Sequence, residues 1–248
     1  MRLRRTSRVV RGGLFAAVLL TLTASGPASA TPVAGTGGHH DTFAVNGTAS
    51  LVREHGTGRK VIELTNGGFK QTGSAWRVEP IAIDRSFETS FTAYLHHGRR
   101  GADGIAFLAQ GSGIRALGGW GGGLGYRGIR RSVAIEFDTY QNTTDPDSNH
   151  LAVVLGGDPD RHRTVVRSSI PLFGRPWRAR IRYDAANEDL RVYVRAMNAG
   201  ARERLMLEER ISLADEIELN DGWIGFTGAT GDYSASQDVY DWTVRTPR

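Results

Sequence analysis

The chain has 248 residues, with 31 basic and 26 acidic side chains, a formal net charge of +5 and no cysteine. The lack of cysteine excludes disulfides and a thiol nucleophile. The excess charge comes from five arginines near the N-terminus: Arg2, Arg4, Arg5, Arg8 and Arg11. The rest of the chain is therefore formally neutral and has no basic stripe that would predict nucleic-acid binding.

The first thirty residues have the pattern of a signal peptide. The arginines form a basic segment, residues 13–22 form an apolar one, and Ala28-Ser29-Ala30 matches an A-x-A cleavage site. We therefore predict cleavage after Ala30 and a secreted, extracellular protein. Arg4-Arg5 leaves the twin-arginine route open beside the general one. The apolar run is too short to span a bilayer, so no membrane insertion is expected.

Residues 31–41 contain Gly, Pro and His and predict a flexible leader, followed by one domain over 42–248. Within that domain, short runs of alternating apolar residues predict strands over 61–64, 77–81, 87–95, 104–109, 132–140, 151–155, 164–167, 177–183, 190–195, 223–227 and 239–244. The window 202–218 is interrupted by Ser212 and predicts one short helical turn. Many strands without alternating helices are typical of a β-sandwich or barrel.

Alternation also predicts which side chains form the core of this sandwich. Aromatic and branched residues at strand positions are expected inside: Phe87, Phe91, Ile105, Phe107, Ile181, Tyr183, Val192, Val194, Phe226 and Trp242.

Two carboxylates lie on one face of the strand predicted over 132–140. Glu136 and Asp138 are two residues apart, so they stand side by side at a Cα separation of roughly 6–7 Å. Such a pair repels, and each raises the pKa of the other unless a cation or a shared proton is present. The loop that follows contains Asn142, Asp145 and His150. Oxygen ligands suit Ca²⁺, and an added imidazole suits a transition ion such as Mn²⁺.

Two other patterns bear on function. Residues 123–128 match G-x-G-x-x-G, but a strand follows them where a dinucleotide site needs a helix. The stretch 118–125 is instead a glycine-rich loop whose backbone can approach a ligand closely. The carboxylate pair is also compatible with a glycoside hydrolase, which uses two acidic residues. Position 141 is Gln, however, so no third acid follows along the same strand.

Five segments, in order, resemble the L-type (legume-type) lectin family, and more closely its bacterial legume-lectin-like domains: 86–91, 102–107, 122–125, 133–139 and 224–231. The resemblance covers nearly all of the chain after the signal peptide. It implies an all-β jelly-roll sandwich of the concanavalin type, in which a curved concave sheet packs on a flatter back sheet.

The resemblance also implies a pair of metal ions. The transition ion, Mn²⁺ or another, would be held by carboxylates and an imidazole: Glu136, Asp138, Asp145 and His150. The Ca²⁺ ion would be held by oxygen ligands: Asp138, the carbonyl of Tyr140, Asn142 and Asp145. Asp147 falls where the family needs no ligand.

The implied carbohydrate site surrounds the Ca²⁺ ligands. Asp103, after a cis bond from Ala102, would accept hydrogen bonds from sugar hydroxyls. A backbone N–H of Gly122 or Gly123 would donate, Asn142 would bridge metal and sugar, Tyr140 would stack on the sugar, and the loop containing Tyr233 would tune sugar choice. Trp120, at the tip of the glycine-rich loop, would either stack on a sugar or brace the loop.

The sequence thus predicts a secreted, calcium-dependent, carbohydrate-binding lectin without catalytic activity, whose partners are glycans. One alternative is a jelly-roll glycoside hydrolase that uses Glu136 and Asp138. Another is an interaction module in which the metals only brace the fold. Neither the sugar nor the oligomeric state is set by these residues, and a homo-oligomer formed through edge strands stays open.

Overall fold

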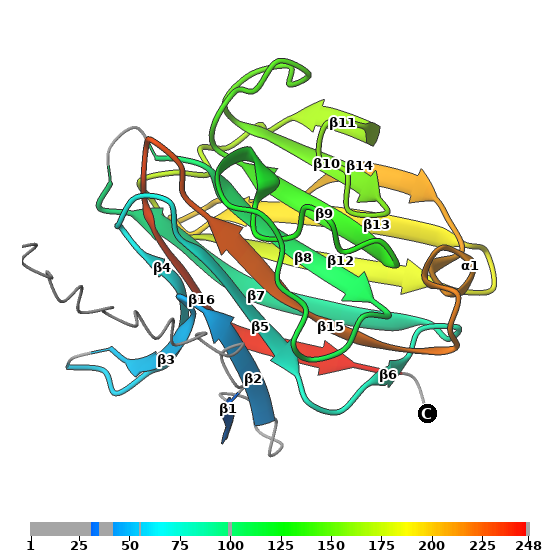
Figure 1. The fold of residues 1–248 in the computed structure, drawn as a ribbon. Coiled ribbons are helices and arrows are strands. Elements are labelled where there is room, and N and C mark those ends of the chain that lie inside the picture. Colours follow the sequence, from blue (N-terminus) through cyan, green and yellow to red (C-terminus); the bar gives the residue numbers. More distant parts are fainter. Residues whose placement is uncertain (1–30, 35–41, 55, 99–100, 247–248) are drawn as a thin grey trace, which may run out of the picture.

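The computed structural model describes residues 31–34, 42–54, 56–98 and 101–246, which form two antiparallel sheets stacked as layers (Figure 1). The larger sheet has nine strands, with β6 (Ile81–Ala82) beside β15 and the other eight in this order: β1 (Thr31–Ala34), β2 (Thr42–Gly47), β5 (Thr72–Arg77), β15 (Asp221–Ala229), β8 (Gly104–Gln110), β9 (Ser132–Asp138), β10 (His150–Leu155) and β11 (His162–Arg167).

The second sheet has seven strands, in this order: β14 (Arg204–Arg210), β13 (Asp189–Ala196), β12 (Trp177–Asp184), β7 (Phe87–His96), β16 (Ser236–Arg245), β4 (Lys60–Asn66) and β3 (Ser50–Arg53). Many neighbours in both sheets are far apart in sequence, as in a jelly roll, so the predicted all-β sandwich is confirmed. Two short helices complete the described elements, α1 (Leu213–Ile217) and the 3₁₀ turn η1 (Gly121–Gly123). Among the described residues, no helix has the length and apolarity that a membrane span requires.

Aromatic side chains join the two sheets in the centre of the core. Phe91 on β7 contacts Phe107, Phe137 and Phe226 of the opposite sheet, with ring centroids 6.3, 5.8 and 4.7 Å away. Every residue that alternation assigned to the core is buried in this cluster. Aromatic pairs of this kind contribute about 0.5–1.5 kcal/mol each beyond the area they bury.

A second, smaller apolar cluster covers the other face of the nine-stranded sheet. It joins sheet residues such as Trp76 and Leu108 to Leu124, Tyr126 and Ile129 of the segment between β8 and β9. The Trp76 indole N–H also donates to the carbonyl of Ala116 at 2.8 Å. The glycine-rich segment is therefore packed down over the sheet, which places η1 next to the end of β9.

The structure differs from the predicted elements in four places. The predicted strand 77–81 is wrong, because β5 ends at Arg77 and β6 begins only at Ile81. Between them lies Pro80, which has no N–H to donate to a ladder.

Strands β2 and β3 precede the first predicted strand, which is that over 61–64. The first part of the window 202–218 is strand β14, paired with β13, and the predicted short helical turn is α1. Ser212 does not break that helix but caps it, since its hydroxyl accepts from the N–H of Asp215 at 3.3 Å.

The predicted flexible leader needs one correction. Residues 31–34 form β1, which pairs with β2, because an edge strand offers free N–H and C=O groups to a neighbouring segment. The predicted signal peptide over 1–30 and the rest of the leader, 35–41, lie outside the described residues.

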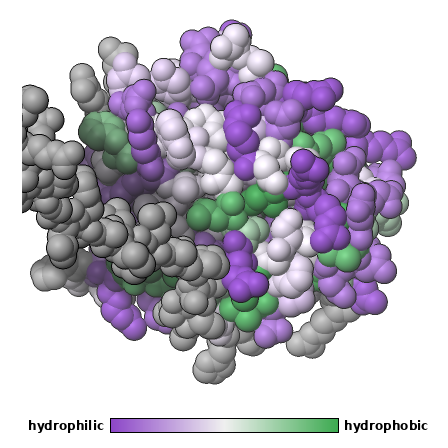
Figure 2. Space-filling view, in the orientation of Figure 1, coloured by the Kyte–Doolittle hydropathy of each residue, from purple (hydrophilic) through white to green (hydrophobic). Residues whose placement is uncertain are grey.

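The side of the molecule in Figure 2 is largely polar, with apolar groups separated from one another. The large apolar side chains that are exposed come from scattered places along the chain, such as Phe69, Trp120, Met197 and Leu205. Apolar residues exposed singly are normal on a protein surface and do not indicate an interface. A homo-oligomer stays a prediction.

Candidate metal centre and the loops around it

Glu136 and Asp138 project from β9 on the face away from the main core. The ladder places Ala106 and Ala152 beside Glu136, and Gly104 and His150 beside Asp138. Small neighbours leave room above Glu136. His150 stands directly opposite Asp138 on the same face, where cross-strand side chains are within reach of each other.

Carboxylates fold the loop after β9 through bonds to its backbone. Asp138 accepts from the N–H of Tyr140 at 2.7 Å, and Asp145 accepts from the N–H of Asn142 at 2.6 Å. Short-range bonds of this type are how aspartates shape turns. The Asp147 carboxylate is held by Arg167 at 3.1 Å, so it is engaged elsewhere. These contacts bring Asp145 back to β9 and over the carboxylate pair.

Two unpartnered polar atoms are buried in this centre. The Nδ1 atom of His150 lies 2.9 Å from the carbonyl oxygen of Asp147, an arrangement that leaves the Nε2 lone pair free. The hydroxyl of Tyr126 donates to one oxygen of Glu136. The second oxygen of Glu136 and Nε2 of His150 have no hydrogen-bond partner, although these residues are 1% and 0% exposed. Buried polar atoms without partners are costly and need an explanation.

The electrostatics of the centre favour a cation. Burial raises the pKa of Glu136 to about 8, against the hydrogen bond from Tyr126. Burial and the nearby Glu136 raise the pKa of Asp138 well above its usual value. Burial lowers the pKa of His150, which favours the neutral imidazole that a metal needs. Carboxylates, a neutral imidazole and orphaned donor atoms in one place fit a metal ion.

His162, which the sequence analysis did not identify, belongs to the same centre. Its Nε2 atom lies 3.4 Å from Oδ1 of Asp145 and 3.7 Å from Oε2 of Glu136. Candidate ligand atoms form two groups, each within 4.8 Å: Glu136, His150 and His162 in one, and Asp138, Asp145 and His150 in the other.

A β-bulge explains why simple alternation misses His162. Val153 pairs with Thr164, but Val154 pairs with His162, so Arg163 is an extra residue in β11. A bulge shifts the register by one and moves the following side chain to the other face. Without it, His162 would point to the face that Thr164 occupies, away from Glu136.

Asp103 lies next to the metal centre, after a cis Ala102–Asp103 peptide bond, as the resemblance implied. Its N–H donates to the carbonyl of Ala229 at 3.0 Å, and its carbonyl accepts from the N–H of Thr139 at 2.9 Å. The residue is 4% exposed, and its Oδ2 atom is buried without a partner. Burial, and secondarily the charge of Asp232, raise the pKa of Asp103 to about 7.

The glycine-rich loop and the loop after β15 meet beside Asp103. The N–H of Gly121 donates to the carbonyl of Thr230 at 3.0 Å, and a Cβ atom at position 231 would lie 3.2 Å from Oδ2 of Asp103. A Cβ atom at Gly122 would lie 2.8 Å from Nδ2 of Asn142. Only glycine permits this close approach of the backbone to Asn142.

The other residues predicted for the sugar site are Tyr140, Tyr233 and the backbone N–H of Gly123. The rings of Tyr140 and Tyr233 are 5.6 Å apart, so two loops contribute one aromatic pair. The N–H of Gly123 donates to the carbonyl of Trp120 at 3.1 Å and is therefore already engaged. Trp120 itself is 53% exposed, with Nζ of Lys70 5.4 Å from its ring centroid.

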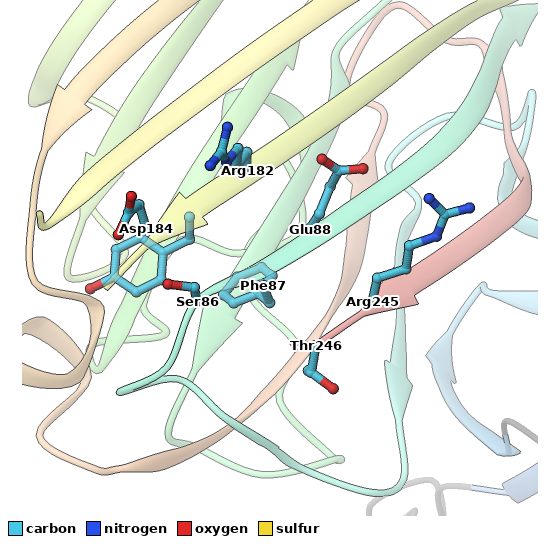
Figure 3. A pocket seen from close by; sticks show the side chains of 8 residues that line it. Ser86, Phe87, Glu88, Arg182, Asp184, Arg245 and Thr246 are labelled. Atoms are coloured by element: carbon cyan, nitrogen blue, oxygen red, sulfur yellow. The ribbon is translucent and has the colours of Figure 1, made fainter. Parts of the chain in front are cut away.

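A separate hollow of about 520 Å³ lies where β7 begins and β12 and β16 end (Figure 3). Charged side chains of both signs surround it, including Glu88, Arg182 and Arg245. Glu88 is already paired with Arg180 at 3.1 Å. None of the buried unpartnered polar atoms among the described residues lies in its lining. The metal centre and its loops are therefore the stronger candidate site.

The fold is a jelly-roll sandwich, and its candidate metal centre consists of acidic residues and histidines beside the glycine-rich loop and the loops after β9 and β15. A family model described as "Legume lectin beta-barrel domain" matches residues 37–241. A lectin of Onobrychis viciifolia is 28% identical over 217 residues, covering 79% of this chain and 82% of that protein. A lectin of Leucomphalos mildbraedii is 28% identical over 213 residues, covering 75% and 85%. The solved lectin II from Ulex europaeus has a TM-score of 0.70 and 22% identity, covering 83% of this chain and 93% of that one.

This chain belongs to the L-type lectin family. It is a carbohydrate-binding lectin, and the prediction of a lectin without catalytic activity is confirmed against the glycoside hydrolase alternative. The structure gives a physical reason as well. Glu136 and Asp138 are 1% and 3% exposed, whereas catalytic carboxylates must flank a glycosidic bond. A closer likeness to bacterial domains stays a prediction, since the relatives reported above are plant proteins.

Proposed function

We propose that this lectin binds sugars in a calcium-dependent manner, at the place where Asp103, Asn142 and the glycine-rich loop meet. Ca²⁺ held by Asp138, the Tyr140 carbonyl, Asn142 and Asp145 would supply the positive charge that balances the buried carboxylates. Mn²⁺ or another transition ion would occupy the neighbouring site, held by Glu136, Asp138, Asp145 and His150.

The observation that carries this proposal is the carboxylate of Asp103. It is buried, its backbone is held on both sides by Ala229 and Thr139, and Oδ2 has no partner within the described residues. A buried carboxylate oxygen in such a position is a strong acceptor for the hydroxyl groups of a ligand, because hydrogen bonds to a charged group are worth about 1.5–3 kcal/mol. Its pKa of about 7 falls when a cation binds nearby, which favours the ionised acceptor.

The surrounding residues supply the other contacts that a sugar needs. Asn142 can donate and accept through its amide, and Gly122 lies against that amide, whereas the N–H of Gly123 already donates to the carbonyl of Trp120. Tyr140 and Tyr233 offer aromatic faces for the apolar side of a pyranose ring.

Titration calorimetry against a glycan panel, with and without EDTA, tests the proposal. The panel includes galactose, N-acetylgalactosamine and a fucoside, because solved lectins of this fold were determined with these ligands. We expect binding in Ca²⁺, loss on chelation, and recovery when Ca²⁺ is restored. Asp103→Asn should weaken binding at least roughly tenfold while Ca²⁺ still binds.

Asp147→Asn is the matched control, because Asp147 is on the same loop as Asp145 but is paired with Arg167. Its sugar affinity should equal that of the parent. Sugar binding that survives chelation unchanged, or an Asp103→Asn variant that binds as well as the parent, would contradict the proposed mechanism.

We also propose that the protein is secreted after cleavage at Ala30, on the pattern of its first thirty residues. Expression of the full chain in a bacterial host and N-terminal sequencing of the product in the medium test this. The expected N-terminus is Thr31, and retention of residues 1–30 in the recovered protein would refute it.

A further inference from the structure

The side chain of His162 lies beside two acidic residues but is not held by a hydrogen bond to either. Its side chain is 7% exposed, and the Nε2 atom is 3.4 Å from Asp145 and 3.7 Å from Glu136. Hydrogen bonds from N–H to oxygen are 2.7–3.2 Å long. The imidazole therefore lies close to two carboxylates at a spacing that a hydrogen bond does not explain.

The spacing does agree with donor atoms around one ion. With bonds of about 2.0–2.1 Å to Zn²⁺, tetrahedral donors lie about 3.3 Å apart. The separations from Asp145 Oδ1 to the Nε2 atoms of His162 and His150 are 3.4 and 3.7 Å, and that from His162 Nε2 to Glu136 Oε2 is 3.7 Å. All three exceed this value by less than half an ångström.

The other groups in this shell have their remaining atoms occupied, as ligands in metal sites do. The Nδ1 atom of His150 lies at hydrogen-bond distance from the backbone carbonyl of Asp147, and the Oε1 atom of Glu136 accepts from the hydroxyl of Tyr126. Only Nε2 of His150 and Oε2 of Glu136 are left without a partner, and both point into the space that His162 borders. Such outer contacts orient ligands and set the tautomer of the imidazole.

We propose that His162 is a further direct ligand of the transition ion, so that the site of Glu136, Asp138, Asp145 and His150 gains a second imidazole and prefers Zn²⁺ to Mn²⁺. Imidazole suits zinc, whereas carboxylate and water oxygens suit manganese. This ligand comes from the bulge in β11 and not from the motif that carries the family resemblance. The proposal rests on the metal part of the proposed function and not on sugar binding.

The structure also offers a route for the ion. His162 lines a hollow of about 350 Å³ together with Asp158 and residues of the β10–β11 turn. An entry path is one of the features required of a metal site. The hollow therefore gives access to the His162 side chain.

The test is a metal titration of the full chain after the signal peptide, stripped with EDTA and held in excess Ca²⁺. The parent should bind Zn²⁺ at least roughly a hundredfold more tightly than Mn²⁺. His162→Ala should weaken Zn²⁺ binding at least roughly a hundredfold, because loss of an outer-shell partner alone costs 10–100-fold. His162→Asp replaces the imidazole by an oxygen ligand, so the ratio of Zn²⁺ affinity to Mn²⁺ affinity should be smaller than in the parent.

Two further readouts separate a ligand from a merely structural histidine. Co²⁺ substituted into the parent should give the intense visible bands of four- or five-coordination, and these should weaken in His162→Ala. Ca²⁺-dependent thermal stabilisation shows that each variant is folded. If His162→Ala does not fold, His162→Gln is used for the same comparisons.

His96→Ala is the matched control, since His96 also has a carboxylate partner, Asp238 at 2.8 Å, but lies on the other sheet. Its Zn²⁺ affinity should equal that of the parent. Unchanged Zn²⁺ affinity and Co²⁺ spectra in the His162 variants would overturn the proposal and make His162 only a charge partner of Glu136 and Asp145. These titrations contain no sugar. Their result therefore tests His162 as a metal ligand even if the proposed mechanism of sugar binding is wrong.

Discussion

Removal of the metals should make the stability of this lectin fall as the pH rises, because its buried carboxyl groups then have to ionise alone. The pKa of Glu136 is raised to about 8 and that of Asp103 to about 7, and that of Asp138 is raised as well. A group whose pKa is higher in the folded state binds more protons there than in the unfolded chain. Its contribution to stability is complete below the unfolded pKa and is lost as the pH rises through the folded one.

The window from pH 6.5 to 9 isolates this effect. Burial lowers the pKa of His150, so its contribution to stability rises with pH, but the unfolded imidazole titrates near pH 6.5 and only a small part of that rise falls within the window. Over this window Glu136 should cost about 2 kcal/mol of unfolding free energy and Asp103 about 1 kcal/mol, with Asp138 adding in the same direction. For a domain of this size, about 3 kcal/mol corresponds to a fall of roughly 6–12 °C in Tm.

Thermal unfolding of the EDTA-stripped protein, followed by circular dichroism at pH 6.5 and 9, measures the effect. Glu136→Gln keeps an acceptor for Tyr126 but cannot ionise, so its fall over the same window should be about 2 kcal/mol smaller. Addition of Ca²⁺ and Zn²⁺ should remove most of the pH dependence in the parent, because the bound ions keep the carboxylates ionised. Equal falls in the metal-free parent and in Glu136→Gln would refute the reasoning.

Two further predictions concern the sugar loops and the core. Gly122→Ala places a methyl group 2.8 Å from the Asn142 amide and should weaken sugar binding at least roughly tenfold in calorimetry, whereas Gly119→Ala, whose Cβ has no contact closer than 3.5 Å, should bind as the parent does. Equal affinities would show that the Gly122 contact is irrelevant. Phe91→Ala should lower the free energy of unfolding by about 3–5 kcal/mol in denaturant titration, because it leaves a cavity between the sheets. The exposed Trp120→Ala should change it by less than about 0.5 kcal/mol, and similar losses in both would contradict the assigned core.

Local patterns in the chain predicted much of the sandwich. Alternation over 132–140 placed Glu136 and Asp138 on one face, and the structure shows that face turned away from the core, in which the intervening Phe137 is buried. This prediction is correct because successive side chains of a regular strand point to alternate faces, so residues two apart share a face. The short helical turn predicted in 202–218 is present as α1, but strand β14 in the same window was missed, since an edge partner is a distant contact that no window of sequence contains.

The candidate site shows the same division. Asp145 and His150 follow β9 closely, so their approach to Asp138 is a matter of short-range loop geometry. The contribution of Tyr126 depends on the packing of the glycine-rich segment over the sheet. That packing results from the burial of apolar residues that are far apart in the chain. No sequence motif around Tyr126 therefore indicates its contact with Glu136.

The sequence by itself determined an all-β chain, its aromatic core and a carboxylate pair followed by oxygen and imidazole ligands, because these depend on residue type and parity along one strand. The family resemblance implied that Asp103, Gly122 and Asn142 share a site, and the tertiary structure places Gly122 against Asn142 and Gly231 against Asp103. Only the tertiary structure decided that His162 joins Glu136 and Asp145. The physical reason is that the closure of loops and the one-residue shift in β11 follow from pairing and burial between strands. Such contacts are absent from any single segment of the chain.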